Sequence, residues 1–202
     1  MELPGADAGR PPGREPNLRR ASPLSDLGSA PVPPPGPDDH VRGADDGPLV
    51  VAYADFECPF CAVLAIRLDA APARQVFRHF PVRSSHPRAW AAAAAAEAAG
   101  AQGRFWEMHD LLFADQGRLE DPHLWERARR LELDVDRFDA DRRSEAVLLR
   151  IRENFQSGVR AGVVTTPTLF AGTRRHTGRI DVGELDRLVG RTPPHQPQLH
   201  PD

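Results

Sequence analysis

Apolar residues between positions 49 and 80 form two short runs, and a helical pattern separates them. The stretch from Leu49 to Cys61 starts as a run of β-branched and apolar residues, which predicts a buried strand. Beyond Cys61, apolar positions recur at helical spacing until Pro72, and the run from Arg74 to Phe80 predicts a second strand. We therefore expect a strand, a helix and a strand, with parallel strands joined by a right-handed crossover.

A long helical block follows the second strand. Apolar positions at helical spacing, or runs of strong helix formers, predict four helices at residues 88–99, 103–116, 122–133 and 135–158. We place the whole block, with the turn that precedes it, at residues 86–162. It interrupts the β pattern, which returns only after it.

The second β portion begins with the run from Val163 to Gly172, which contains Pro167. A proline inside an apolar β run argues against a central strand and fits a turn at a strand start, where the X–Pro bond can be cis. A hairpin turn at residues 172–173 leads into residues 174–177. A short amphipathic helix over residues 181–189 closes the domain.

Both ends of the chain differ in composition from this middle part. Residues 1–38 are rich in Pro, Gly, Ser, Asp and Arg without apolar periodicity, which predicts a disordered arm. Residues 191–202 predict a flexible tail, so one α/β domain remains at residues 39–190. A hydrophobic content of 40% in 202 residues can supply the core of such a domain.

Charge and hydropathy narrow the class of protein. A formal net charge of −3 and a pI near 6.2 give no footprint for nucleic acid or for a membrane surface. No segment approaches the length needed to span a bilayer. The first residues, Met1 to Asp7, lack the basic and apolar regions of a signal peptide. We expect a cytoplasmic protein, unless a misassigned start hides an export signal.

The chemistry of the chain is concentrated in Cys58-Pro59-Phe60-Cys61, which contains its only two cysteines. Cys58 falls where the strand passes into the helix, with Pro59 at the first helical position. A thiolate at a helix N-terminus faces unpaired N–H groups and the positive end of the helix dipole, so its pKa falls. Asp55 and Glu57 oppose this effect, which predicts a moderate decrease. Cys61 is close enough to attack a mixed disulfide formed at Cys58.

Two plainer interpretations compete with redox chemistry. The cysteines could be structural, or they could form half of a zinc site. Zinc normally requires four protein ligands, and His79, His86 and His176 are not spaced as a partner pair for the cysteines. His109 is a candidate base, but a histidine on a helix face beside Asp110 is more often a packing or surface residue.

Taken together, these motifs resemble the thioredoxin superfamily and, more narrowly, the bacterial DsbA-like thiol:disulfide oxidoreductases. This family includes free-standing proteins and domains appended to NhaA-type antiporters. The resemblance covers about residues 39–190. Its motifs are DFECPFC at 55–61, RHFP at 78–81, FWEMHD at 105–110, SGVR at 157–160 and TPTLF at 166–170.

The resemblance implies an α/β thioredoxin fold with an inserted helical domain. Cys58 would be the attacking thiol and Cys61 the resolving thiol, with no cofactor other than their redox-active disulfide and no metal. Thr166 and Pro167 would form a cis peptide facing the cysteines and pair with an extended substrate. The apolar rim would be made by Phe56, Phe60 and Val164.

Three positions depart from the family pattern. The family usually has a buried carboxylate six residues before the nucleophile, which relays protons to the resolving cysteine, and this chain has Ala52 there. The proton for a leaving Cys61 must then come from water or another residue, so we expect slow or differently pH-dependent exchange. Thr165 replaces a usual glycine, and we expect it to narrow the approach to the cysteines. The run from Cys61 to Phe80 is shorter than usual.

The function that we expect is a thiol:disulfide oxidoreductase, with a reductase-like or isomerase-like direction. Its partners would be protein or small-molecule thiols and disulfides, with glutathione or a thioredoxin-type reductant as candidate redox partners. The alternative is a non-catalytic thioredoxin-fold module that binds peptide or regulates another protein. A third hypothesis, a glutathione-dependent transferase or isomerase, fits less well because such relatives typically lack the resolving cysteine.

Overall fold

The computed structural model describes residues 30–190. The predicted flexible tail at 191–202 and most of the predicted disordered arm lie outside this range. Within residues 30–190, no helix is both long and apolar enough to cross a membrane.

A five-stranded mixed sheet forms the centre of the molecule, in the order β1-β3-β2-β4-β5. The middle pair, β2 (Leu49–Ala54) and β3 (Arg74–His79), is parallel, as the sequence predicted. Strands β4 (Thr168–Ala171) and β5 (Arg174–Thr177) add an antiparallel hairpin beside β2. The edge strand β1 (His40–Gly43) pairs antiparallel with β3 and was not predicted, because Val41 is its only apolar residue.

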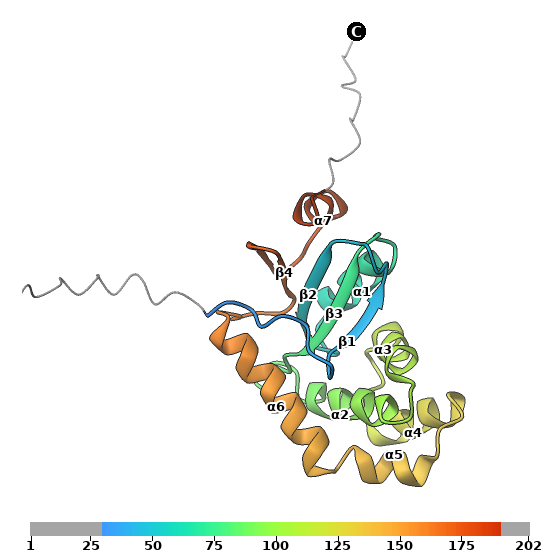
Figure 1. The fold of residues 1–202 in the computed structure, drawn as a ribbon. Helices are drawn as coiled ribbons and strands as arrows, with labels where there is room; N and C mark the ends of the chain where they lie inside the picture. The colour runs from blue at the N-terminus through green and yellow to red at the C-terminus, as the bar shows by residue number, and fades with distance from the viewer. Residues whose placement is uncertain (1–29, 191–202) are drawn as a thin grey trace, which may run out of the picture.

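Five helices are inserted between β3 and β4 (Figure 1). The helix α1 (Pro59–Asp69) joins β2 to β3. The last helix, α7 (Val182–Leu188), lies at the end of the sheet opposite to α2, α4 and α5. The inserted helices are α2 (Ala89–Gly100), α3 (Phe105–Ala114), α4 (Asp121–Arg130), α5 (Val135–Asp141) and α6 (Glu145–Arg160).

The single long helix predicted at residues 135–158 is wrong, because two helices occupy this range. The first ends at Asp141, and Ser144 begins the second by accepting a hydrogen bond from the backbone N–H of Val147 at 3.3 Å. A serine oxygen satisfies an otherwise unpaired donor at a helix start, so it favours a new N-terminus over continuation of the helix.

The two faces of the sheet bury alternate residues of β2. Val50 and Ala52 face a core that α1 and α7 supply with leucines, and Ala54 joins the aromatic and alanine-rich core of the inserted helices. On the other face, Val51 and Tyr53 pack with Phe155 of α6. This alternation follows from the period of two along a strand.

Helix α6 approaches the second face closely because residue 158 is a glycine. A Cβ atom built at Gly158 would lie 2.7 Å from a ring carbon of Phe80 and 2.9 Å from one of Tyr53. The Tyr53 hydroxyl lies 2.9 Å from the Ser157 hydroxyl at the same contact.

The prediction of disorder is wrong for the last residues of the arm, which contact the folded domain. Ala30 donates a backbone hydrogen bond to the Arg160 carbonyl at 2.8 Å, and Arg78 donates to the Pro34 carbonyl at 3.2 Å. Val32 packs against the core on the α6 face. These contacts show that residues 30–38 lie along α6 and β3. The hydrogen bonds satisfy backbone groups of this segment, and the sequence pattern did not reveal their partners.

Candidate active site

The turn from β2 into α1 positions the two cysteines. Cys58 is the N-cap residue of α1, with extended backbone angles, and Pro59 opens the helix where its missing N–H leaves no hydrogen bond unmade. The Cys58 carbonyl accepts backbone hydrogen bonds from Cys61 at 3.0 Å and from Ala62 at 3.3 Å. The first helical turn thus brings the two side chains to the same place, as the sequence predicted.

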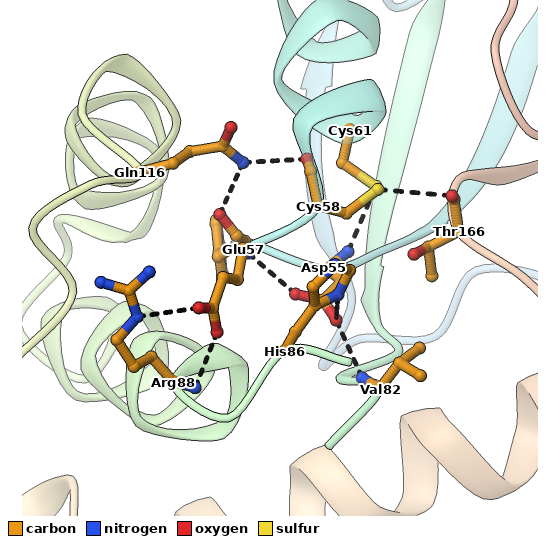
Figure 2. A network of polar contacts seen from close by, with 10 residues as sticks. Asp55, Glu57, Cys58, Cys61, Val82, His86, Arg88, Gln116 and Thr166 are labelled. Atoms are coloured by element: carbon orange, nitrogen blue, oxygen red, sulfur yellow. Dashed lines mark hydrogen bonds and ion pairs between the residues drawn. The ribbon is translucent and has the colours of Figure 1, made fainter. Parts of the chain in front are cut away.

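Both cysteines are free thiols in a nearly closed environment. Cys58 is 3% exposed, and its thiol donates to the Thr166 carbonyl oxygen at 3.4 Å. Cys61 is 1% exposed, and its sulfur accepts the backbone N–H of Asp55 at 3.4 Å. Figure 2 shows the sulfur atoms between the Asp55 backbone and Thr166. The Thr166–Pro167 peptide bond is cis.

The two thiols have opposite acidities. The pKa of Cys58 is lowered to about 6, chiefly by a hydrogen bond from the Cys61 thiol and also by Thr166 and by the backbone N–H groups of Phe60 and Cys61. Burial raises the pKa of Cys61 well above 9.0, and the negative charges of Cys58 and Asp55 raise it further. Cys58 is therefore a thiolate near neutral pH, while Cys61 remains a thiol.

Asp55 anchors the loop before Cys58 with a fully buried carboxylate. It accepts hydrogen bonds from the backbone N–H groups of Glu57 and Val82, each at 2.8 Å, and lies 2.9 Å from Nδ1 of His86 (Figure 2). The carboxylate thus joins the cysteine loop to the segment that enters the helical insertion.

A second set of contacts holds the same loop from the insertion itself. Glu57 accepts hydrogen bonds from the backbone N–H of Arg88 at 2.7 Å and from its guanidinium at 2.8 Å, and Arg88 also pairs with Glu120. Gln116 donates to the carbonyls of Phe56 at 2.8 Å and Cys58 at 2.9 Å (Figure 2). No sequence pattern pointed to Arg88 or Gln116, because each contacts the loop only through the tertiary fold.

The predicted substrate rim needs one correction. Phe60 is 48% exposed and Val164 is 85% exposed, as a rim requires. Phe56 is only 1% exposed and stacks on Phe77, with ring centroids 5.1 Å apart, so it belongs to the core and cannot contact a substrate at the surface. Thr166 is buried beside Cys58 and presents its carbonyl oxygen to that thiol.

Each of the histidines that were considered as metal ligands has its own hydrogen-bond partner. His79 bonds to Glu97, His86 to Asp55 and His176 to the carbonyl of Arg179. Among residues 30–190 there is no group of three or more His, Cys, Asp or Glu side chains that could hold a metal ion.

Known protein families and solved structures resemble this chain in sequence and in fold. Residues 36–191 match the family model described as thioredoxin. A thioredoxin-like oxidoreductase from Silicibacter pomeroyi is 26% identical, with a TM-score of 0.68 over 76% of this chain and 91% of that chain. The thiol-disulfide exchange protein α-DsbA2 from Wolbachia pipientis has the same fold, with 19% identity and a TM-score of 0.66 over 75% of this chain and 85% of its own.

Curated relatives with higher identity are larger proteins. An Na⁺/H⁺ antiporter NhaA of Salinispora arenicola is 47% identical over 166 residues, which are 77% of this chain and 25% of the antiporter. One from Herminiimonas arsenicoxydans is 42% identical over 173 residues, or 82% of this chain and 27% of that protein. The chain thus spans about a quarter of the length of the curated relatives it matches. Since the family model covers most of the domain, this chain belongs to the thioredoxin family, and it shares its fold with the DsbA protein of Wolbachia pipientis.

Proposed function

We propose that this protein is a thiol:disulfide oxidoreductase that uses Cys58-Pro59-Phe60-Cys61 through a mixed disulfide. The observation that carries the proposal is the opposite acidity of the two thiols. A pKa of about 6 makes Cys58 a thiolate at neutral pH, and the buried Cys61 stays protonated until a mixed disulfide has formed.

In the reductive direction, the Cys58 thiolate attacks one sulfur of a substrate disulfide. A bond forms between Cys58 and that sulfur, the substrate S–S bond breaks, and the other substrate sulfur leaves as a thiolate that solvent protonates. Cys61 then loses its proton and attacks Cys58, which closes the Cys58–Cys61 disulfide and releases the second substrate thiolate. Two electrons pass to the substrate, and the reverse sequence oxidises a substrate dithiol.

The surface around Cys58 supports a polypeptide substrate. Phe60, two residues after Cys58, and Val164, two residues before Thr166, expose apolar side chains, while Cys58 itself is almost covered. An extended segment could pair with the backbone around Val164 to Thr166 while its side chains contact these two residues. Glutathione or a thioredoxin-type reductant would then restore the cysteine pair.

The equilibrium redox state of the cysteine pair tests this function. We would poise the protein across a glutathione series and count free thiols by mass tagging, with Cys58→Ser as the control that cannot form the intramolecular bond. We expect one two-electron transition; a midpoint above about −200 mV indicates an oxidant and one below about −250 mV a reductase. If no Cys58–Cys61 disulfide forms at any poise, the proposal fails and the non-catalytic binding module replaces it.

A further inference from the structure

A small cavity adjoins the buried sulfur side of α1. Its volume is about 10 Å³, and it lies between β2, β3, α1 and α3. Its wall contains Cys61 and two polar side chains, Gln75 and His109, and is otherwise made of Ala52, Ala54, Leu64, Ala65, Leu68, Phe77 and Phe113. This volume is close to the smallest that admits one water molecule, and the three polar groups supply the partners that a buried water requires.

The hydrogen bond of His109 to its neighbour fixes which ring nitrogen can accept a proton. Nδ1 lies 2.7 Å from Oδ1 of Asp110, and this is the only hydrogen bond of the ring among residues 30–190. Because an ionised carboxylate can only accept, Nδ1 carries the hydrogen and Nε2 keeps its lone pair. The ring is 1% exposed, packs edge-on against Phe77 and Phe113, and lines the cavity. With Nδ1 bonded to Asp110, Nε2 is the ring nitrogen left to take up a proton from the cavity.

Cys61 needs a proton acceptor at this position. To attack the mixed disulfide it must lose a proton in a buried site where the carboxylate of Asp55 disfavours a second negative charge. Asp55 itself is already engaged by Val82 and His86. We propose that His109 accepts the proton of Cys61 through one water molecule in the cavity and returns it when Cys61 leaves the disulfide. This inference rests on the oxidoreductase function proposed above.

Each bond that forms in this step is matched by a bond that breaks. The Cys61 S–H bond breaks as its proton passes to the water, a proton of the water passes to Nε2 of His109, and the Cys61 electron pair forms the bond to Cys58. The bond between Cys58 and the substrate sulfur breaks, and that sulfur leaves with its electron pair. The imidazolium then gives up the Nε2 proton to solvent through the cavity water, which restores the neutral ring with its hydrogen on Nδ1 facing Asp110.

The charges around His109 are compatible with this role. Burial lowers the pKa of His109, the Asp110 carboxylate raises it, and the charges of Arg42 and His79 lower it further. Arg42 comes from β1 and is itself paired with Asp110, His79 comes from β3, and Cys61 faces the cavity from α1. The ring is therefore neutral near pH 7 and able to accept a proton transiently.

Two kinetic phases separate this inference from the proposed function. A coloured aromatic disulfide, dithio-bis-nitrobenzoate, should release one thiolate when Cys58 attacks and a second when Cys61 resolves the mixed disulfide. In the native protein we expect the second phase to be nearly independent of pH above neutrality. In His109→Gln it should be about 100-fold slower at pH 7 and should rise about tenfold per pH unit, because the rate then follows the Cys61 thiolate fraction.

The first phase should be unchanged in His109→Gln, because the variant leaves Cys58 and Thr166 in place. A second phase with native rate and pH profile in that variant would overturn the role of His109. If neither protein shows a second phase, or the first phase itself is absent, the failure belongs to the proposed function instead.

Two further variants keep the test decisive if His109→Gln does not fold. Asp110→Asn changes a half-exposed residue and removes the carboxylate that fixes the tautomer, so the second phase should slow about tenfold with an altered pH profile. Gln75→Glu, combined with His109→Gln, places a nearly isosteric carboxylate in the same cavity and should restore about tenfold of the lost rate. An unaltered second phase in Asp110→Asn, or no recovery in a folded double variant, would count against the inference.

Discussion

His79 and His109 are both 1% exposed and contact the same Phe77 ring, but the surroundings of their polar atoms differ. His79 bonds to Glu97, a carboxylate that is only 5% exposed. His109 bonds to Asp110, which is 54% exposed, and its ring lines the cavity that contains Cys61. The two buried histidines therefore differ in the exposure of their carboxylate partner and in their position relative to the cavity beside Cys61.

The Glu97 region is a closed network. One oxygen of Glu97 lies 2.8 Å from His79 and 3.0 Å from His40, and the other lies 2.8 Å from the Arg150 guanidinium. Burial alone would raise the pKa of Glu97, but the hydrogen bonds from His40 and His79 outweigh it and hold the pKa well below 4.5. The network joins β1, β3, α2 and α6, so it fastens the helical insertion to the sheet.

The surroundings of His109 differ from this network. Its carboxylate partner, Asp110, is half exposed, and the His109 ring lines the cavity that Cys61 also lines. We infer that the Glu97 network serves stability and the His109 pair serves proton transfer. Variants that change one of the two regions and spare the other test this division.

Removal of the resolving thiol should eliminate the contribution of His109 completely. In Cys61→Ser, the mixed disulfide at Cys58 should persist and turnover should fall to background, because no second thiol can attack it. Adding His109→Gln to this variant should change nothing further. Intact-mass spectrometry of the trapped adduct measures both points, and continued release of substrate thiol from Cys61→Ser would contradict the mechanism.

Glu97→Gln should destabilise the fold without altering Cys58. We expect a loss of about 3 kcal/mol in the free energy of unfolding, because the variant leaves buried histidine and arginine groups without their carboxylate. Asp110→Asn is the matched control and should cost less than about 1 kcal/mol, because Asp110 is half exposed. Urea unfolding gives both values, and similar costs would show that the two regions do not differ in this way.

Acid should lower the stability of the native protein through the same network. The folded pKa of His79 is lowered from 6.5 by burial despite its bond to Glu97, and that of Glu97 is lowered from 4.5, so the unfolded chain binds more protons in acid. Stability is then fully present above pH 6.5 and declines as the pH falls, first through the His79 range and then below pH 4.5.

The free energy of unfolding, measured from pH 7.5 down to pH 4, checks the direction of this pH dependence. His109 has a lowered pKa as well and contributes in the same direction, so His109→Gln should lose only part of the acid sensitivity. A stability that rises on acidification across this range would contradict the assignment of His79 and Glu97.

Gln116→Ala should give the smallest effect. The variant removes two hydrogen bonds from the helical insertion to the carbonyls of Phe56 and Cys58, at a cost of about 1 kcal/mol. The thiolate absorbance of Cys58 should still titrate near pH 6, because its largest stabilising contact comes from Cys61. A large change in that titration would show that the insertion controls the nucleophile as well as the position of its loop.

Much of the fold could be predicted because its signals are local. The run at Leu49 to Ala54 and the start of a helix after Cys58 depend on residues adjacent in the chain, and the structure confirms both. The parallel pairing of β2 and β3 followed from the helix between them. A capping serine at residue 144 was a local signal as well, but the helical spacing on either side of it concealed the break.

The remainder was decided by contacts between residues far apart in sequence. Strand β1 has too little apolar pattern to be recognised and exists because β3 offers it an edge. Glu97 lies within an alanine run, and only the packing of α2 brings it to His79 and Arg150. Phe56 looked like a rim residue beside the cysteines until the sheet and α3 enclosed it.

The sequence by itself therefore determined the thioredoxin-like order of elements and the position of the two cysteines at the start of α1. Only the tertiary structure decided which groups surround Cys61, because the cavity is closed by side chains from four separate elements. Periodicity and capping act over a few residues, whereas burial and proton transfer depend on distances that the complete fold sets.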